Sequence, residues 1–151
     1  MRPGSVSTAY FIDTSALLKA YIQEKGTEAM DRVFQEDAPK TISSMGLVEA
    51  VSVLQWLRSV EKVLSEEQFA MLCARLMADA NSGRLEIRNV TPYDIQSAID
   101  LEMTRYLTAV DAVQIALASE MADNMVFVSS DEKLNRVARE LGLKVLDPTT
   151  N

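Results

Sequence analysis

The sequence predicts an α/β domain in which a parallel sheet of short strands is covered by helices on both faces. Short apolar runs that fit buried strands alternate along the chain with segments of helical period. Strands of this kind, separated by helices, are typical of a parallel sheet buried on both sides. The 151 residues contain no repeat, low-complexity tract or linker and are enough to bury a core, so we expect one domain over residues 1–151.

The first half of the chain carries signals for two strands and four helices. Residues 9–12 form an apolar, aromatic run, and residues 40–43 fit a second short strand. Helices are expected over residues 14–23, 27–35 and 47–60, the last capped by Ser43 or Ser44. Ser65-Glu66-Glu67-Gln68 is a capping box that begins another helix. The apolar face of that helix contains Phe69, Leu72, Cys73, Leu76, Met77 and Ala80, so we expect Cys73 to be a buried core thiol.

The second half repeats the alternation. Gly83 ends the fourth helix, and residues 85–90 alternate like a strand. Thr91-Pro92 begins a helix whose inward residues are expected to be Ile95, Ala98, Ile99, Met103 and Tyr106. A nearly all-apolar helix follows over residues 109–121, then a buried strand over residues 126–128. The last helix covers residues 131–141, is stopped by Gly142 and precedes a strand over residues 143–146; its inward residues are expected to be Leu134, Val137, Ala138 and Leu141.

The composition excludes several chemistries. The chain has no histidine and one cysteine, which rules out His-based catalysis, His-ligated zinc, an intrachain disulfide and Cys-rich metal sites. No glycine pair fits a nucleotide-binding loop. No apolar run approaches a membrane span and the N-terminus lacks a signal-peptide core, so we expect a cytoplasmic protein. The net charge of −7 argues against nonspecific nucleic-acid binding.

Four acidic residues stand where a carboxylate is unexpected. Asp13 and Asp131 follow predicted strands, at the edge where open α/β sheets bind ligands. Glu49 and Asp111 lie in apolar helices, where a buried charge costs several kcal/mol unless it is compensated. Structural explanations exist for each of the four. The aspartates at the strand ends could simply favour helix starts.

The two helical acids also have structural alternatives. Glu49 could pair with Arg58 or Arg105, and Thr108 with Asp111 resembles a capping box. Taken together, four carboxylates near one edge of a sheet repel one another unless cations lie between them. Oxygen ligands without His or Cys suit Mg²⁺ or Mn²⁺. Such a site acidifies water and stabilises in-line attack on phosphorus.

Four motifs in this order resemble PIN domains, most closely the VapC-type toxins of VapBC toxin–antitoxin pairs. They are Tyr10-Phe11-Ile12-Asp13-Thr14-Ser15, Leu47-Val48-Glu49-Ala50, Leu107-Thr108-Ala109-Val110-Asp111-Ala112 and Val128-Ser129-Ser130-Asp131. The resemblance covers residues 9–148 and implies a three-layer α/β/α fold and a metal-dependent ribonuclease. It implies an Mg²⁺ or Mn²⁺ site of Asp13, Glu49, Asp111 and Asp131, with hydroxyls of Ser15 and Ser129 nearby. It further implies a homodimer and a small antitoxin partner. Gln114 departs from the family, which often has His there.

Basic residues follow two of the four acids in the sequence and are candidate RNA contacts. Lys133, Arg136 and Arg139 recur at steps of three after Asp131, and Lys19 lies on the helix after Asp13. Such a row is more often a solvated surface than an RNA-binding groove. One rival is a phosphatase with Asp13 as nucleophile, although Ser15 breaks the expected Asp-x-Asp pattern. The other rival is a non-catalytic member of the fold that binds RNA or a protein.

Overall fold

The computed structural model describes residues 8–121 and 123–150 and contains a parallel sheet of five strands in the order β3-β2-β1-β4-β5. The strands are β1 (Ala9–Ile12), β2 (Lys40–Ser43), β3 (Glu86–Arg88), β4 (Met125–Val128) and β5 (Lys144–Leu146). All five predicted strands are confirmed. The chain starts at the central strand, builds outward to β3, then crosses to β4 and β5 on the other side, so the strand order reverses at β1.

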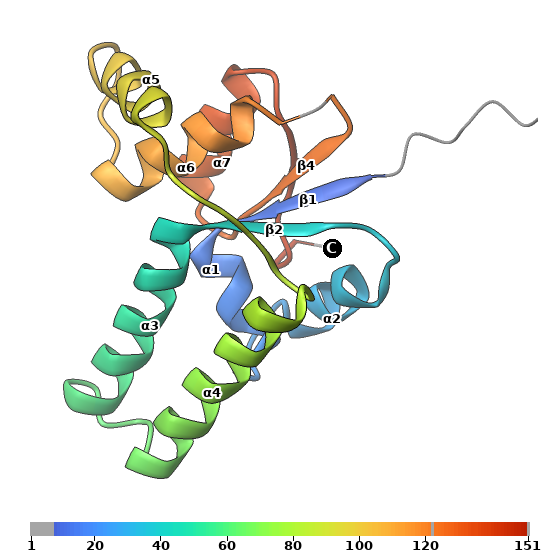
Figure 1. Ribbon diagram of the computed structural model, residues 1–151, viewed down its shortest axis with the longest axis vertical. Coiled ribbons are helices and arrows are strands. Elements are labelled where there is room, and N and C mark those ends of the chain that lie inside the picture. Colours follow the sequence, from blue (N-terminus) through green and yellow to red (C-terminus); the bar gives the residue numbers. More distant parts are fainter. Residues whose placement is uncertain (1–7, 122, 151) are drawn as a thin grey trace, which may run out of the picture.

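Helices cover both faces of the sheet, which makes three layers (Figure 1). The layer of α1 (Thr14–Leu17), α2 (Thr27–Gln35), α3 (Ser44–Ser59) and α4 (Glu66–Ser82) lies on one face. The layer of α5 (Pro92–Glu102), α6 (Ala109–Ser119) and α7 (Glu132–Glu140) lies on the other. Side chains of β1 alternate between the two faces of the sheet, and each face has its own hydrophobic core. Tyr10 and Ile12 pack in the core beneath the first layer, and Phe11 packs in the core beneath the second layer, stacked on Phe127 of β4.

Most helix limits follow the predicted caps. Ser43 caps α3, the capping box at Ser65 begins α4, and Gly83 and Gly142 adopt positive φ after α4 and α7. The helix predicted over residues 14–23 is shorter, because α1 continues as a single 3₁₀ turn, η1 (Leu18–Ala20), and the chain then leaves the helix. There the Thr27 hydroxyl donates to the Lys19 carbonyl (2.8 Å), which supplies the partner that a longer helix would have given.

The expected inward face of α5 is wrong. Ala98 is buried, but Ile95 and Ile99 are 45% and 49% exposed, and Met103 and Tyr106 are 81% and 76% exposed. The helix instead turns Asp94 and Ala98 toward the second layer, because Asp94 is held by its own capping box. The helix is present as predicted, but its buried face is the one that carries the cap residue Asp94 and not the one that carries the largest apolar residues.

Two smaller expectations also differ. On α4 the buried residues are Leu72 and Leu76, whereas Met77 is exposed and Cys73 is only partly buried against the first core. Leu141 lies beyond the end of α7 and is 36% exposed. Within the part of the chain that the structure describes, no helix is long and apolar enough to span a membrane.

Candidate functional site

Asp13 lies where the central strand β1 ends and α1 begins, and it is 3% exposed. Its main-chain N–H donates to the Val128 carbonyl at the end of β4 (2.9 Å). Two hydroxyls donate to its Oδ2 atom, Ser15 Oγ at 2.7 Å and Ser129 Oγ at 3.1 Å. Burial nevertheless raises the pKa of this carboxyl above its usual value, although the hydrogen bonds act to lower it. The carboxylate at the centre of the edge is therefore fixed in position but short of compensating charge.

The same hydroxyls connect Asp13 to the start of α7. Ser15 Oγ accepts from the Ser130 main-chain N–H, and Ser129 Oγ accepts from that of Asp131, both at 3.1 Å. Asp131 caps α7, since its Oδ1 accepts from the Leu134 N–H at 3.1 Å. The structure thus brings together Asp13, Ser15, Ser129 and Asp131 from two neighbouring strand ends, as the sequence predicted.

Asp111 lies in the first turn of α6, next to its N-cap Thr108. Thr108 Oγ1 accepts from the Asp111 N–H at 3.3 Å, but no reciprocal bond from the Thr108 main chain to the Asp111 carboxylate occurs among the described residues. The capping-box alternative therefore explains why Thr108 begins α6, but it does not explain why an aspartate stands at position 111. Burial, joined by the charges of Asp13, Asp131 and Glu49, raises the pKa of Asp111 to about 6, against the effect of the Thr108 hydroxyl.

Glu49 lies in the second turn of α3. Burial raises its pKa, the Thr14 hydroxyl opposes this, and the charge of Asp13 raises it further. The alternative ion pairs do not form, since Arg58 pairs with Glu66 and Arg105 with Glu140 (3.1 Å). The charges of the other three acids thus act on Asp111, and the charge of Asp13 also acts on Glu49.

The chemistry of the site fits a divalent cation, although a ready-made cluster is not formed. Among residues 8–121 and 123–150, no three acidic or cysteine side chains converge closely enough to hold a metal ion. In the same residues none of the four acids pairs with a Lys or Arg. Carboxylates that repel one another without a cation lower their free energy when one is present. Four carboxylates without His or Cys are a donor set of the kind that Mg²⁺ or Mn²⁺ prefers.

Three buried polar residues, Gln114, Thr14 and Asn135, are absent from the predicted set of site residues. Gln114 is fully buried one turn after Asp111, and neither its Oε1 nor its Nε2 has a partner among the described residues. A Cβ at Gly46 would lie 3.7 Å from both Gln114 Oε1 and Thr14 Oγ1, so these groups line one small polar region. Asn135 donates from Nδ2 to the Ser129 carbonyl (2.7 Å) and so supports the Ser129 turn. In the sequence, Asn135 could have been recognised as a buried polar residue, because it lies on the face of α7 that is otherwise formed by Leu134, Val137 and Ala138.

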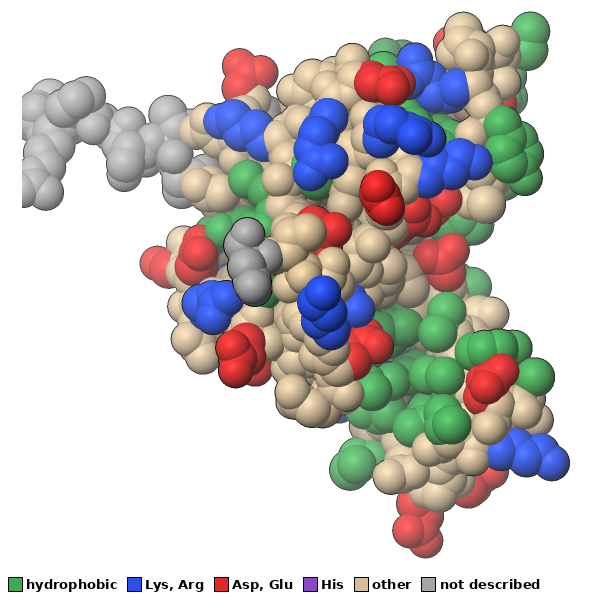
Figure 2. Space-filling model, turned by 180° about the vertical axis from the view of Figure 1, so that it is seen from behind, with side chains coloured by type: hydrophobic (Ala, Val, Ile, Leu, Met, Phe, Trp, Pro, Cys, Tyr) green, Lys and Arg blue, Asp and Glu red, His purple; other side chains and the backbone are tan. Residues whose placement is uncertain are grey.

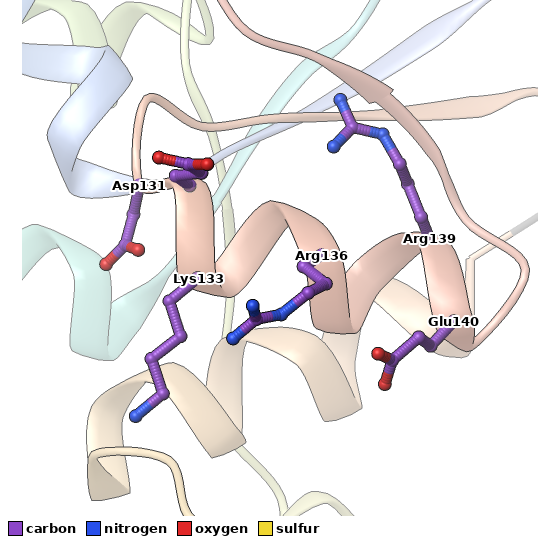
Figure 3. Close-up of a pocket in the computed structure, with 6 residues that line it drawn as sticks. Asp131, Lys133, Arg136, Arg139 and Glu140 are labelled. Carbon is purple, nitrogen blue, oxygen red and sulfur yellow. The ribbon is translucent and has the colours of Figure 1, made fainter.

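The predicted RNA contacts divide into two groups. Lys19 is 8% exposed and its ammonium pairs with Glu24 (3.1 Å), so it is not an exposed surface cation. Lys133, Arg136 and Arg139 are exposed on α7 and line an open groove with Asp131, Glu132 and Glu140. Figure 3 shows Lys133 and Arg136 extending on one side of α7 and Arg139 on the other. Only the first two therefore form one row with Asp131.

Comparison with known proteins agrees with this architecture. The family model of the PIN domain matches residues 10–140, so the chain belongs to the PIN domain family. The four acidic residues and helices α1 to α7 lie within the matched residues, whereas the edge strand β5 follows them. No curated protein matches the sequence.

Solved structures with a similar fold come from toxin–antitoxin systems. VapC20 of Mycobacterium tuberculosis, described as a toxin that cleaves the sarcin-ricin loop, superposes with a TM-score of 0.66 at 14% identity, covering 85% of this chain and 95% of that one. VapBC-1 of nontypeable Haemophilus influenzae gives 0.64 at 15% identity, with 95% and 100% covered. VapBC2 of Rickettsia felis, bound to a promoter DNA fragment, gives 0.61 at 18% identity, with 93% and 98% covered. At these identities the likeness shows the fold.

Proposed function

We propose that this PIN domain is an endoribonuclease that hydrolyses RNA phosphodiester bonds with Mg²⁺ or Mn²⁺, and that it is the toxin of a toxin–antitoxin pair. The observation that carries the proposal is the uncompensated set of Asp13, Glu49, Asp111 and Asp131, delivered from four elements to one edge of the sheet. The fold of VapC20, described as cleaving an RNA loop, supports the same substrate class.

Each residue has a distinct part in the proposed reaction. The four carboxylates would hold the metal, which when bound supplies Lewis acidity and lowers the pKa of water near the scissile phosphate. Ser15 and Ser129 fix the Oδ2 atom of Asp13 through their hydroxyls. Hydrolysis by in-line attack would leave a 5′-phosphate and a 3′-hydroxyl. No side-chain general base is required, in keeping with a chain that has no histidine.

The two rival functions have less support. Asp13 is 3% exposed and its Oδ2 already accepts two hydrogen bonds, which disfavours it as a phosphatase nucleophile. A binding-only module would not need Asp111 to lie partly buried beside three acids whose charges raise its pKa further, because that arrangement costs stability without a cation.

The decisive experiment is cleavage of defined RNAs by wild type, Asp13→Asn and Asp111→Asn in Mg²⁺ or Mn²⁺, with and without a chelator. We expect both variants to lose activity by roughly a hundredfold or more, since each loses a charged ligand. Asp37→Asn is the matched control, because Asp37 is exposed in the connection between α2 and β2. Cleavage by Asp111→Asn at the wild-type rate would overturn the proposal and would point to a contaminating nuclease.

RNA phosphates are proposed to bind along Lys133 and Arg136. Both are exposed in the α7 groove beside Asp131, and neither forms an ion pair among the described residues. Figure 2 shows Lys and Arg side chains gathered on the upper part of one face even though the whole chain is acidic. A local cationic row of this kind suffices for phosphate contacts when a bound metal offsets the carboxylates.

An antitoxin is proposed to dock in an apolar groove of the first layer. The groove is lined by Leu18, Ile22, Val53, Leu57, Val63 and Leu64, together with Glu24 and with Ser15, whose hydroxyl donates to Asp13. Hydrophobic side chains gather on the lower part of the face seen in Figure 2. The VapBC folds similar to this chain are complexes of paired proteins, which supports a small protein as occupant. A partner bound in this groove would reach the acidic site directly.

A homodimer is proposed through the outer face of α5. Ile95, Ile99 and Met103 recur at steps of four and are 45%, 49% and 81% exposed, an apolar stripe that a second copy would cover. Ile95→Glu should convert a dimer to a monomer in sedimentation analysis. A wild-type chain that sediments as a monomer would contradict this part.

A further inference from the structure

Tyr106 is an exposed aromatic residue that the fold does not need. It lies in the connection between α5 and α6, where its side chain is 76% exposed. The Lys133 ammonium lies 4.6 Å from the centroid of its ring, a cation–π contact between that connection and α7. The ring is thus held by one neighbour while most of its surface remains in solvent.

The pair lies at the edge of the carboxylate site. Tyr106 precedes by two residues Thr108, the N-cap of the helix that carries Asp111. Lys133 follows by two residues Asp131, the N-cap of α7. In Figure 3, Lys133 extends from the start of α7, beside Asp131, toward the side on which Arg136 also lies. The aromatic surface of Tyr106 therefore contacts Lys133, which lines one groove with Arg136 and Asp131.

We propose that Tyr106 and Lys133 form a stacking platform for one unpaired nucleobase of the RNA next to the scissile phosphate. This inference rests on the proposed ribonuclease function and deepens it. The ring accepts a base on its exposed surface, and Lys133 and Arg136 hold the adjoining phosphates. Aromatic side chains combined with a cationic groove are the usual means of binding single strands without sequence preference.

The platform defines a substrate class. A base in a duplex already has both faces stacked, so it cannot stack on Tyr106 without leaving the helix. The site therefore selects RNA that is unpaired at this position. Because every base has a π-face, the platform selects for strandedness and not for a particular base.

The test measures RNA binding in the Asp111→Asn background, which prevents cleavage. The probe is a short fluorescein-labelled single-stranded RNA of mixed sequence, compared with the same strand annealed to its complement. We expect single-stranded RNA to bind more tightly than the duplex, and Tyr106→Ala to weaken single-strand binding by roughly tenfold. Tyr106→Phe and Tyr106→Trp should retain it. Tyr93→Ala is the matched control, because Tyr93 is 68% exposed on α5 but lines a different cavity.

Several outcomes would overturn the platform. The proposal fails if Tyr106→Ala binds single-stranded RNA with the same affinity as Tyr93→Ala. It also fails if Tyr106→Ala loses affinity for single-stranded RNA and for duplex RNA by the same factor. A change in oligomeric state of Tyr106→Ala in sedimentation analysis would assign the ring to a subunit contact instead. These results leave the proposed function intact if wild type cleaves RNA and Asp111→Asn does not. Failure of the function itself would appear as wild-type cleavage that does not depend on Asp111.

Discussion

Helices α5 and α6 begin with the same local pattern, a threonine N-cap followed three residues later by an aspartate, yet the two aspartates have opposite environments. Asp94 is fully buried, and its Oδ2 accepts from the Thr91 N–H (2.7 Å) and hydroxyl (2.8 Å). Burial acts to raise its pKa, but those bonds and the charge of Arg88 lower it on balance. Asp111 lacks the reciprocal bond and a cation, and its pKa rises to about 6.

The difference separates a structural acid from a candidate functional one. The Asp94 cluster, which we define as Asp94, Glu120 and Arg88, carries its own cation, since Arg88 pairs with Glu120. The four site acids have none among the described residues. Uncompensated carboxylates are typical of sites that sacrifice stability for binding. The contrast can be tested by adding a divalent cation to the four-acid site, by mutating Asp94 in the compensated cluster, and by changing pH.

The largest expected effect comes from adding Mg²⁺ or Mn²⁺ to the wild-type protein. A cation bound only by the folded state at a hundredfold excess over its Kd stabilises it by about 2.7 kcal/mol, which thermal unfolding would detect as a higher Tm. Asp13→Asn should lose most of this shift, whereas Asp94→Asn should keep it. The proposed cation site is contradicted if the Tm of wild type does not rise with the cation, or if the Tm of Asp13→Asn rises by the same amount as that of wild type.

Removing the compensated acid should have the next largest effect. Asp94→Ala leaves the Thr91 N–H without its partner and removes the neighbour of the Arg88–Glu120 pair, so we expect a loss of about 2 kcal/mol in the free energy of unfolding. Asp13→Asn without metal should instead be neutral or stabilising, because it removes an uncompensated buried charge.

Urea titrations of both variants would measure these opposite signs. Asp100→Ala is the control, as Asp100 is exposed on the same helix as Asp94. Equal destabilisation by Asp94→Ala and Asp13→Asn would remove the distinction between the two kinds of acid.

The same pair of helices shows which features of the fold and the site depend on local sequence. Hydrophobic runs and caps predicted all five strands and the main helices, because these depend on local pattern. The four acids were found because they interrupt apolar segments or follow strands. The pattern could not tell Asp94 from Asp111. The difference arises from the reciprocal Thr91 hydrogen bonds and Arg88 at Asp94, and from burial beside three acids distant in sequence at Asp111. It also could not predict that Lys19 is buried against Glu24, which depends on the turn after η1.

The smallest expected effect is in the pH dependence of stability without metal. A carboxyl whose pKa is higher in the folded state binds its proton more tightly there, so its contribution to stability is fully present below the unfolded pKa and is lost as pH rises through the folded one. For Asp111 this window runs from its ordinary value of 3.8 to about 6.

The free energy of unfolding of wild type should accordingly contain a component that falls with rising pH across that window, and Asp111→Asn should lack it. Chemical denaturation at several pH values, with a chelator present, measures the difference between the two curves. Parallel curves would mean that burial and the neighbouring charges of Asp13, Asp131 and Glu49 do not raise the pKa of Asp111 in solution. Addition of Mg²⁺ should flatten the wild-type curve, because a cation that favours the ionised carboxyl restores the pKa toward its ordinary range.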